Sequence, residues 1–123
     1  TWVMQRSHRQ LQPHAGKGRA ALLVLLVVFG IFALHTVQIW LYALLYVGLG
    51  ELRTFEEALY FSTTTFASVG FGDIVLSPRW RMLSAIEAAN GLILFAWSTA
   101  FLLTVTSRLR LIEHEWLEPK RHD

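Results

Sequence analysis

The sequence predicts an all-α membrane protein with two spanning helices, a short re-entrant helix between them, and several copies assembled around one axis. Two long runs, at residues 20–49 and 82–106, are almost free of charge, and a shorter and more polar segment separates them. The chain has 123 residues, of which 54% are hydrophobic. That apolar content is too high for the core of so small a soluble domain.

The first run contains no formally charged side chain, and its strongly polar residues are His35, Thr36 and Gln38. A helix needs about 20 residues to cross a bilayer core of ~30 Å. A secretory signal peptide has an apolar stretch of only about 7–15 residues. Residues 20–49 are therefore predicted to form the first spanning helix.

The second run contains a single charge, at Glu87. We expect its helix to cover residues 79–110. Both runs are apolar on nearly all sides, which in a short chain indicates contact with lipid rather than burial in a soluble core.

Thr54 followed by Glu57 matches a capping box and predicts a helix over residues 55–66. At ~1.5 Å per residue this helix is roughly 18 Å long, which is too short to cross the membrane. The next segment, residues 68–73, contains two glycines that argue against continued helix. Half a span followed by irregular backbone describes a re-entrant loop, which must be buried in protein or line water.

Basic residues indicate the orientation. Eight of the 11 Lys and Arg residues flank the outer ends of the two runs, in residues 1–19 and after residue 107. Both termini, including the tail at residues 111–123, are therefore expected in the cytoplasm. This distribution explains the basic pI, so no nucleic-acid partner is expected.

No enzyme is expected either. The chain has no cysteine, its histidines lie alone or in the terminal segments, and no nucleophile and base are paired.

The loop at residues 68–73 has the chemistry of a cation site. Backbone carbonyls ligate a dehydrated cation when consecutive peptides face one axis. Gly70 and Gly72 permit the backbone angles that this requires. Ser68 adds a hydroxyl, and Asp73 from several copies would form an acidic ring at the outer mouth. The short helix points the negative end of its dipole at the ion. Two spans are too few to enclose a pore, so several copies must share it.

The segment Ser68-Val69-Gly70-Phe71-Gly72-Asp73 resembles the selectivity-filter signature of potassium channels, Thr-Val-Gly-Tyr-Gly-Asp. Residues 58–65 resemble the pore helix of that family. The order of span, pore helix, filter and span is similar to the two-transmembrane bacterial potassium channels over residues 20–109. Read alone, Gly70-Phe71-Gly72 also fits part of a dinucleotide fingerprint, but the strand, third glycine and helix that this fingerprint needs are missing.

The resemblance implies a homotetrameric pore domain over residues 20–110 in the bacterial inner membrane, passing K⁺ passively. It implies K⁺ at the carbonyls of Ser68, Val69, Gly70 and Phe71, with Gly72 completing the filter and Asp73 at the mouth. It implies no cofactor other than these ions. The remaining expected roles are filter support by Tyr60, Thr63, Thr64 and Glu87, a cavity and gate lined by Leu92, Phe95, Thr99 and Leu103, and a hinge at Gly91.

Several of these positions have a second interpretation. The stripe containing Phe95 and Thr99 fits lipid contact or helix packing equally well by periodicity alone. Gly91 fits close packing as well as a hinge.

Two buried polar residues also have alternatives. A charge inside a span costs at least ~2.5–3.5 kcal/mol at its centre, so Glu87 must have partners or lie near water. We expect it to join Gln38, Asn90 and a pore-helix threonine in a hydrogen-bond cluster, with ion binding or proton sensing as the alternative. His35 is expected to be a packing residue, with pH sensing as the alternative.

Two departures from the family signature bear on selectivity. Ser68 replaces threonine, and Phe71 replaces tyrosine and so lacks a phenol that could brace the filter. The alternatives to a potassium channel are a poorly selective cation channel and a non-conducting membrane subunit with the same fold.

Overall fold

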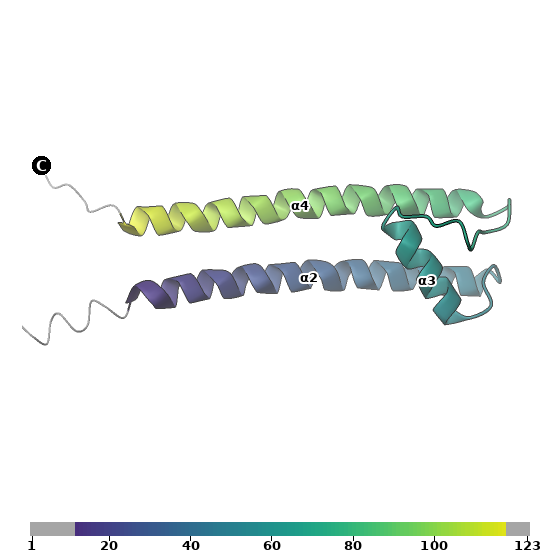
Figure 1. Ribbon diagram of the computed structural model, residues 1–123, viewed down its shortest axis with the longest axis horizontal. Coiled ribbons are helices and arrows are strands. Elements are labelled where there is room, and N and C mark those ends of the chain that lie inside the picture. Colours follow the sequence, from purple (N-terminus) through teal and green to yellow (C-terminus); the bar gives the residue numbers. More distant parts are fainter. Residues whose placement is uncertain (1–11, 118–123) are drawn as a thin grey trace, which may run out of the picture. The chain divides into compact units, whose positions relative to one another are not determined.

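A computed structural model of the protein describes residues 12–117, with side chains described for residues 16–112 (Figure 1). Its elements in order are α2 (Gln12–Gly48), α3 (Phe55–Phe66) and α4 (Arg81–Leu117). No strand occurs within residues 12–117, which confirms the all-α prediction. The chain divides into two compact units, Thr1–Gly30 with Phe101–Asp123, and Ile31–Ala100. The second of these, hereafter the central unit, contains α3 and the loop that follows it.

Both long helices extend beyond the apolar runs that predicted them. α2 begins at Gln12 rather than residue 20, and α4 continues to Leu117 rather than residue 110. Apolar content marks the part of a helix that lipid covers, whereas backbone hydrogen bonding propagates further into polar sequence. α4 also begins two residues later than expected, because the Trp80 and Arg81 N–H groups both bond the carbonyl of Ser77 in a tight turn.

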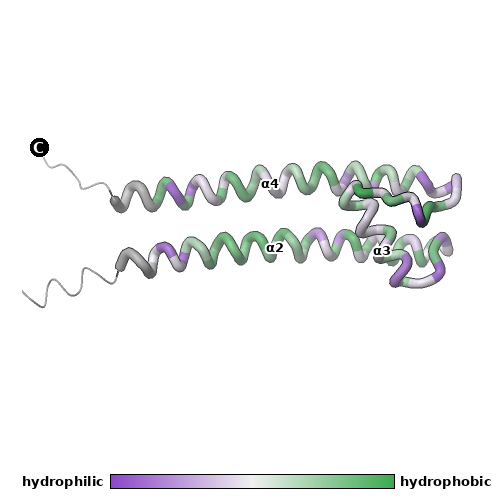
Figure 2. The backbone as a smooth tube through the Cα atoms, viewed as in Figure 1, coloured by the Kyte–Doolittle hydropathy of each residue, from purple (hydrophilic) through white to green (hydrophobic). Residues whose placement is uncertain are grey.

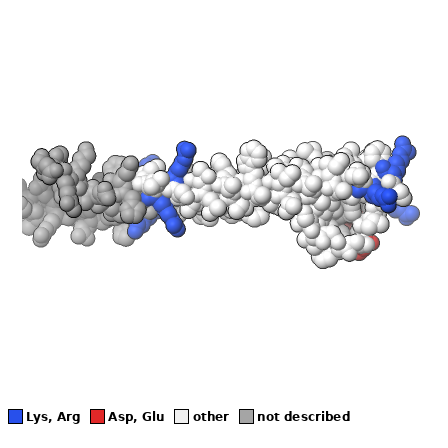
Figure 3. Space-filling model, turned by 90° about the horizontal axis from the view of Figure 1, so that it is seen from above, with Lys and Arg blue, Asp and Glu red and all other residues white. Residues whose placement is uncertain are grey.

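Two helical segments, Gly16–Gly48 and Arg81–Ile112, are long and apolar enough to cross a membrane. Apolar residues follow one another along both helices (Figure 2). Large side chains such as Phe29 and Trp97 are exposed on them, whereas the core helices of a soluble protein bury such groups. Lys and Arg side chains lie near the ends of the described helices and leave their middle uncharged (Figure 3). The two-span prediction is therefore confirmed.

The short helix α3 has the bounds that the sequence predicts, Phe55–Phe66. Thr54 caps it, because its side-chain oxygen accepts a hydrogen bond from the Glu57 N–H at 3.1 Å. The second half of the expected capping box differs. The Glu57 carboxylate accepts from the N–H of Arg53, at 3.3 Å, instead of from Thr54.

The core of the central unit packs α3 against the end of α2. Its buried residues are Ala43, Tyr46, Leu52, Ala58, Phe61 and Leu76. The rings of Tyr46 and Phe61 meet edge to face, with centroids 5.3 Å apart. The Glu51 carboxylate joins the segment between α2 and α3 to the segment between α3 and α4. It accepts from both the N–H and the hydroxyl of Ser77 at 2.9 Å.

Candidate functional site

The loop at residues 68–73 is fastened to the last turn of α3 by backbone hydrogen bonds. The carbonyl of Thr64 accepts from the N–H groups of both Val69 and Gly70, at 2.9 and 3.2 Å. The carbonyl of Thr65 accepts from the N–H of Ser68 at 2.9 Å. Two of the carbonyls that the helix leaves unpaired at its C-terminus, those of Thr64 and Thr65, are thus satisfied by the loop itself. The position of the loop consequently depends on the position of α3.

The sign of the backbone φ angle alternates along this loop. Ser68, Gly70 and Gly72 have positive φ angles of 59°, 54° and 75°, whereas Val69 and Phe71 between them do not. Glycine adopts this left-handed conformation without the steric cost that an L side chain incurs. Because φ alternates in sign, the loop leaves the helical path, and such backbone suits a row of carbonyls that face one side as cation ligands.

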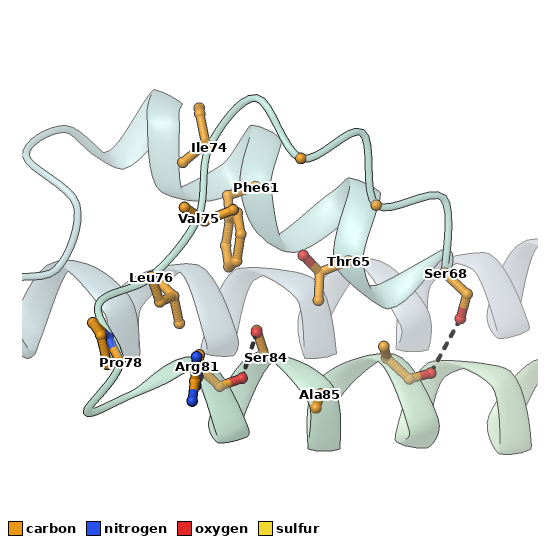
Figure 4. A pocket seen from close by; sticks show the side chains of 13 residues that line it. Phe61, Thr65, Ser68, Ile74, Val75, Leu76, Pro78, Arg81, Ser84 and Ala85 are labelled. Atoms are coloured by element: carbon orange, nitrogen blue, oxygen red, sulfur yellow. Dashed lines mark hydrogen bonds between the residues drawn. The ribbon is translucent and has the colours of Figure 1, made fainter.

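Ser68 is the one non-glycine residue with positive φ among the described residues, a conformation that costs about 1–2 kcal/mol. Besides the N–H bond to Thr65, its hydroxyl donates to the carbonyl of Ala88 on α4 at 3.2 Å (Figure 4). These two bonds hold the residue in place. Because the hydroxyl donates its hydrogen to Ala88, its lone pairs are left to act as ligands.

A hydrogen bond between Tyr60 and Asp73 joins α3 to the far end of the loop. The Tyr60 hydroxyl donates to the Asp73 carboxylate at 2.9 Å, and this bond raises the pKa of Tyr60 above its ordinary value. The phenol therefore stays protonated at neutral pH and keeps donating. Asp73 also accepts from the N–H of Ile74 at 3.1 Å.

Thr63 and Thr64 contact the loop through their carbonyls and not through their side chains. Their hydroxyls donate back to Leu59 and Phe61 of their own helix, at 2.6 and 3.1 Å. The carbonyl of Thr63 accepts from the N–H of Ala67 at 3.1 Å. Support for the loop thus comes from the end of the helix as a whole.

The predicted partners of Glu87 are wrong. Glu87 is fully buried and bonds Tyr46 of α2 and Ser62 of α3, each at 2.5 Å. Gln38 instead bonds His35, and Asn90 bonds the Tyr42 hydroxyl at 3.4 Å. The position of each residue along its helix does not show which way its side chain points around that helix.

His35 lies in a packed environment of the central unit. Its ring nitrogens lie 3.2 Å from Gln38 Oε1 and 3.1 Å from Ser98 Oγ. Its ring meets Phe95 at 4.8 Å and Phe66 at 5.8 Å between centroids. This is the packing environment expected for His35, and its role as a pH sensor stays a prediction.

The α4 stripe expected to line a cavity divides into two parts. Leu92, Thr99 and Leu103 are exposed on the chain. Phe95 is also exposed, at 37%, but its ring contacts those of His35 and Phe66, with centroids 4.8 and 5.5 Å away. One side of Phe95 therefore packs within the chain.

Gly91 lies directly against the end of α3. A Cβ atom on Gly91 would stand 1.9 Å from the carbonyl oxygen of Phe66 and 2.8 Å from its carbonyl carbon. α4 is continuous through this position. The close-packing interpretation of Gly91 is the one that the structure supports, and the hinge stays a prediction.

A cavity of about 570 Å³ separates the loop from the first turns of α4 (Figure 4). Its walls come from the loop and the segment after it, from one face of α3 and from one face of α4. They include Gly70, Gly72 and Val75, with Phe61 on α3 and Ala88 on α4. The side of the loop that faces α4 is therefore not filled by its own chain.

A family model described as "Ion channel" matches residues 21–108, well over half of the chain. The chain belongs to this ion channel family. No curated protein and no solved structure gives a significant match. The channel is an integral membrane protein whose two spans carry the loop between them, and its family activity is ion passage rather than catalysis.

Sequence reasoning missed three features of this channel site. They are the two hydroxyl partners of Glu87, the contact of Gly91 with Phe66, and the clamp of Glu51 on Ser77. A buried carboxyl requires hydrogen-bond donors, so a search for hydroxyl side chains at the depth of Glu87 could have found Tyr46 and Ser62.

Proposed function

We propose that the protein is a potassium-selective channel in which four copies surround one pore. The observation that carries this proposal is the alternating backbone at Ser68, Gly70 and Gly72. With the carbonyls of residues 68–71 aligned, four such rows around an axis supply rings of oxygen ligands that replace the water shell of K⁺. Flow is passive and follows the electrochemical gradient.

The remaining parts of the site fit this function. Asp73 places a carboxylate beside the filter, where four copies form an acidic ring that concentrates cations. α3 is a half-span helix whose C-terminal end carries the filter, so it re-enters the membrane from the side opposite the termini. Leu92, Thr99 and Leu103 line the path below the filter. Both termini lie in the cytoplasm, as the basic flanks indicate.

Surfaces that a single chain leaves exposed favour a tetramer. Val69 and Phe71 are 54% and 68% exposed, and the filter faces an unfilled cavity on the α4 side. Two spans and one re-entrant helix enclose no pore by themselves. Neighbouring copies close the ring and cover the exposed filter side chains.

The test is ion flux through the purified protein in liposomes. We expect a reversal potential that follows the K⁺ gradient, exclusion of Na⁺, and block by Ba²⁺. A reversal potential that ignores the K⁺ gradient would support the poorly selective cation channel instead, and the absence of flux would support the non-conducting subunit. The mass of the detergent-solubilised assembly tests for four copies.

A pair of glycine variants links flux to the filter backbone. Gly70→Ala should abolish selective flux, because alanine is strained at a φ of +54° although no atom blocks its methyl group. Gly48→Ala is the matched control, since no atom lies within 4 Å of its added Cβ and its φ is not positive. Equal flux from the two variants would contradict the role of the alternating backbone.

A further inference from the structure

The three helices of the central unit meet at one buried carboxyl group. Glu87 of α4 contacts Tyr46 of α2 through Oε2 and Ser62 of α3 through Oε1. The Ser62 hydroxyl has a second neighbour, the carbonyl oxygen of Ile39 on α2, at 2.9 Å. Three oxygen–oxygen contacts at hydrogen-bond distance therefore form one chain from Tyr46 through Glu87 and Ser62 to Ile39.

Counting the hydrogens along this chain favours the protonated form of Glu87. A carboxylate and a carbonyl can only accept, and Ser62 has a single O–H hydrogen. If Glu87 were ionised, Ser62 would face two acceptors with one hydrogen. One of its two short contacts would then join two oxygen lone pairs with no hydrogen between them.

A neutral Glu87 satisfies every contact. The Glu87 O–H on Oε1 donates to Ser62, Ser62 donates to the Ile39 carbonyl, and the Tyr46 hydroxyl donates to Oε2. Three hydrogens then serve three contacts, and no buried polar atom of the described side chains lacks a partner. No other arrangement of these hydrogens satisfies all three.

The surroundings of Glu87 also favour the neutral form. Glu87 is 0% exposed, and within the described residues its hydrogen-bond partners are two hydroxyls and no Lys or Arg. An ionised carboxyl buried without a cation is strongly disfavoured inside a membrane protein.

Among the side chains of residues 16–112, no titratable group that could compensate a charge on Glu87 is bonded to it. α2 presents Tyr46, with Tyr42 stacked on it at 6.4 Å between ring centroids. On α3, Glu57 and Tyr60 are bonded elsewhere, to Arg53 and Asp73, and Glu56 is exposed. On α4 the nearest charge in sequence is Arg81, six residues away and so about 9 Å along the axis on another face.

Glu87 also positions the filter. Ser62 and Phe66 are one turn apart on α3, and their contacts Glu87 and Gly91 are one turn apart on α4. The two helices are thus held at two adjacent points, one a hydrogen bond and the other a backbone contact. The filter begins two residues after Phe66 and is bonded to the same turn of α3.

We propose that Glu87 is a neutral carboxylic acid whose proton ties α2, α3 and α4 together, and that its loss at alkaline pH releases α3 and stops conduction. Deprotonation removes the donor to Ser62 and leaves a charge behind the filter with no cation to pair it. The conduction half of the proposal rests on the proposed function, whereas the protonation half does not.

Glu87→Gln is the decisive variant. The amide N–H₂ replaces the acid O–H as donor to Ser62, and the amide oxygen accepts from Tyr46, so a neutral junction is preserved without a titratable proton. We expect this variant to unfold at the same temperature as the wild type at neutral pH. At alkaline pH the wild type should lose thermal stability and flux, and E87Q should retain both. Each unit of pH above the titration midpoint lowers the protonated fraction about tenfold.

Infrared spectroscopy of the purified protein in bilayers tests the proton directly and needs no conduction. The wild type should show a carboxylic-acid carbonyl band at neutral pH that is lost in E87Q and on raising the pH. Ser62→Ala removes the hydroxyl that lies between Glu87 and the Ile39 carbonyl, and it should destabilise the wild type and E87Q equally. His35→Gln should keep the alkaline loss.

Three results would overturn the proposal: no acid band removed by E87Q, an E87Q variant much less stable than wild type at neutral pH, or the same alkaline loss in both. If the wild type passes no ions, the infrared and unfolding measurements still decide the protonation state. The failure of the proposed function is thereby distinguished from the failure of this inference.

Discussion

Replacing Gly91 by alanine tests how α4 is fitted to the end of α3. The added Cβ would lie 1.9 Å from the Phe66 carbonyl oxygen, whereas ordinary van der Waals contact begins at 3.4 Å. One helix must therefore move by about 1.5 Å, the difference between these distances. The obstructing atoms are backbone, so no side-chain rotation relieves the clash.

Two free-energy terms oppose each other in this variant. Alanine improves helix propensity by about 1 kcal/mol over glycine. Overpacking costs about 1–3 kcal/mol, and contact with rigid backbone places this site at the upper end. We expect a net loss of roughly 2 kcal/mol in the free energy of unfolding. Because the loop at residues 68–73 is bonded to the displaced turn, the K⁺ selectivity that we propose should fall as well.

The assay is thermal unfolding of the purified variant, followed by flux in liposomes. Gly30→Ala is the matched control, since Gly30 lies inside α2 with no atom within 4 Å of an added Cβ. This control should be stabilised by about 0.5–1 kcal/mol. If G91A unfolds at or above the wild-type temperature and keeps its selectivity, the packing argument is refuted. A change in open probability alone would favour the hinge.

Three further variants test the contacts of α3 and of the segments on either side of it. Tyr60→Phe should loosen Asp73 and shift the reversal potential toward that of Na⁺, with thermal unfolding nearly unchanged. In the wild type this bond should persist through neutral pH and weaken only as pH rises through the raised pKa of Tyr60. Glu51→Ala should lower the free energy of unfolding by about 1–3 kcal/mol, measured by thermal unfolding, because both bonds to Ser77 are lost. Thr54→Ala should cost about 1 kcal/mol through loss of the α3 cap, and Thr54→Ser should restore it.

Local sequence rules were enough for the spans, for α3 and for the left-handed backbone at Gly70 and Gly72, but not for that at Ser68. Lipid-facing helices are recognised by apolar length, and neither run depends on a partner for its assignment. The bounds of α3 follow from the cap at Thr54 and the glycines that come after Phe66. Left-handed backbone at Gly70 and Gly72 was expected because glycine alone adopts it freely.

Tertiary structure alone decided which side chains meet. The position of Glu87 in a span predicted that it needs partners, but the crossing of α3 over α4 chose Ser62 and the rotation of α2 chose Tyr46. The same crossing brings Phe66 against Gly91 and against the ring of Phe95. Hydropathy and helical spacing give depth and periodicity along one helix. They do not give the rotation of each helix about its axis, which depends on packing against helices distant in the chain.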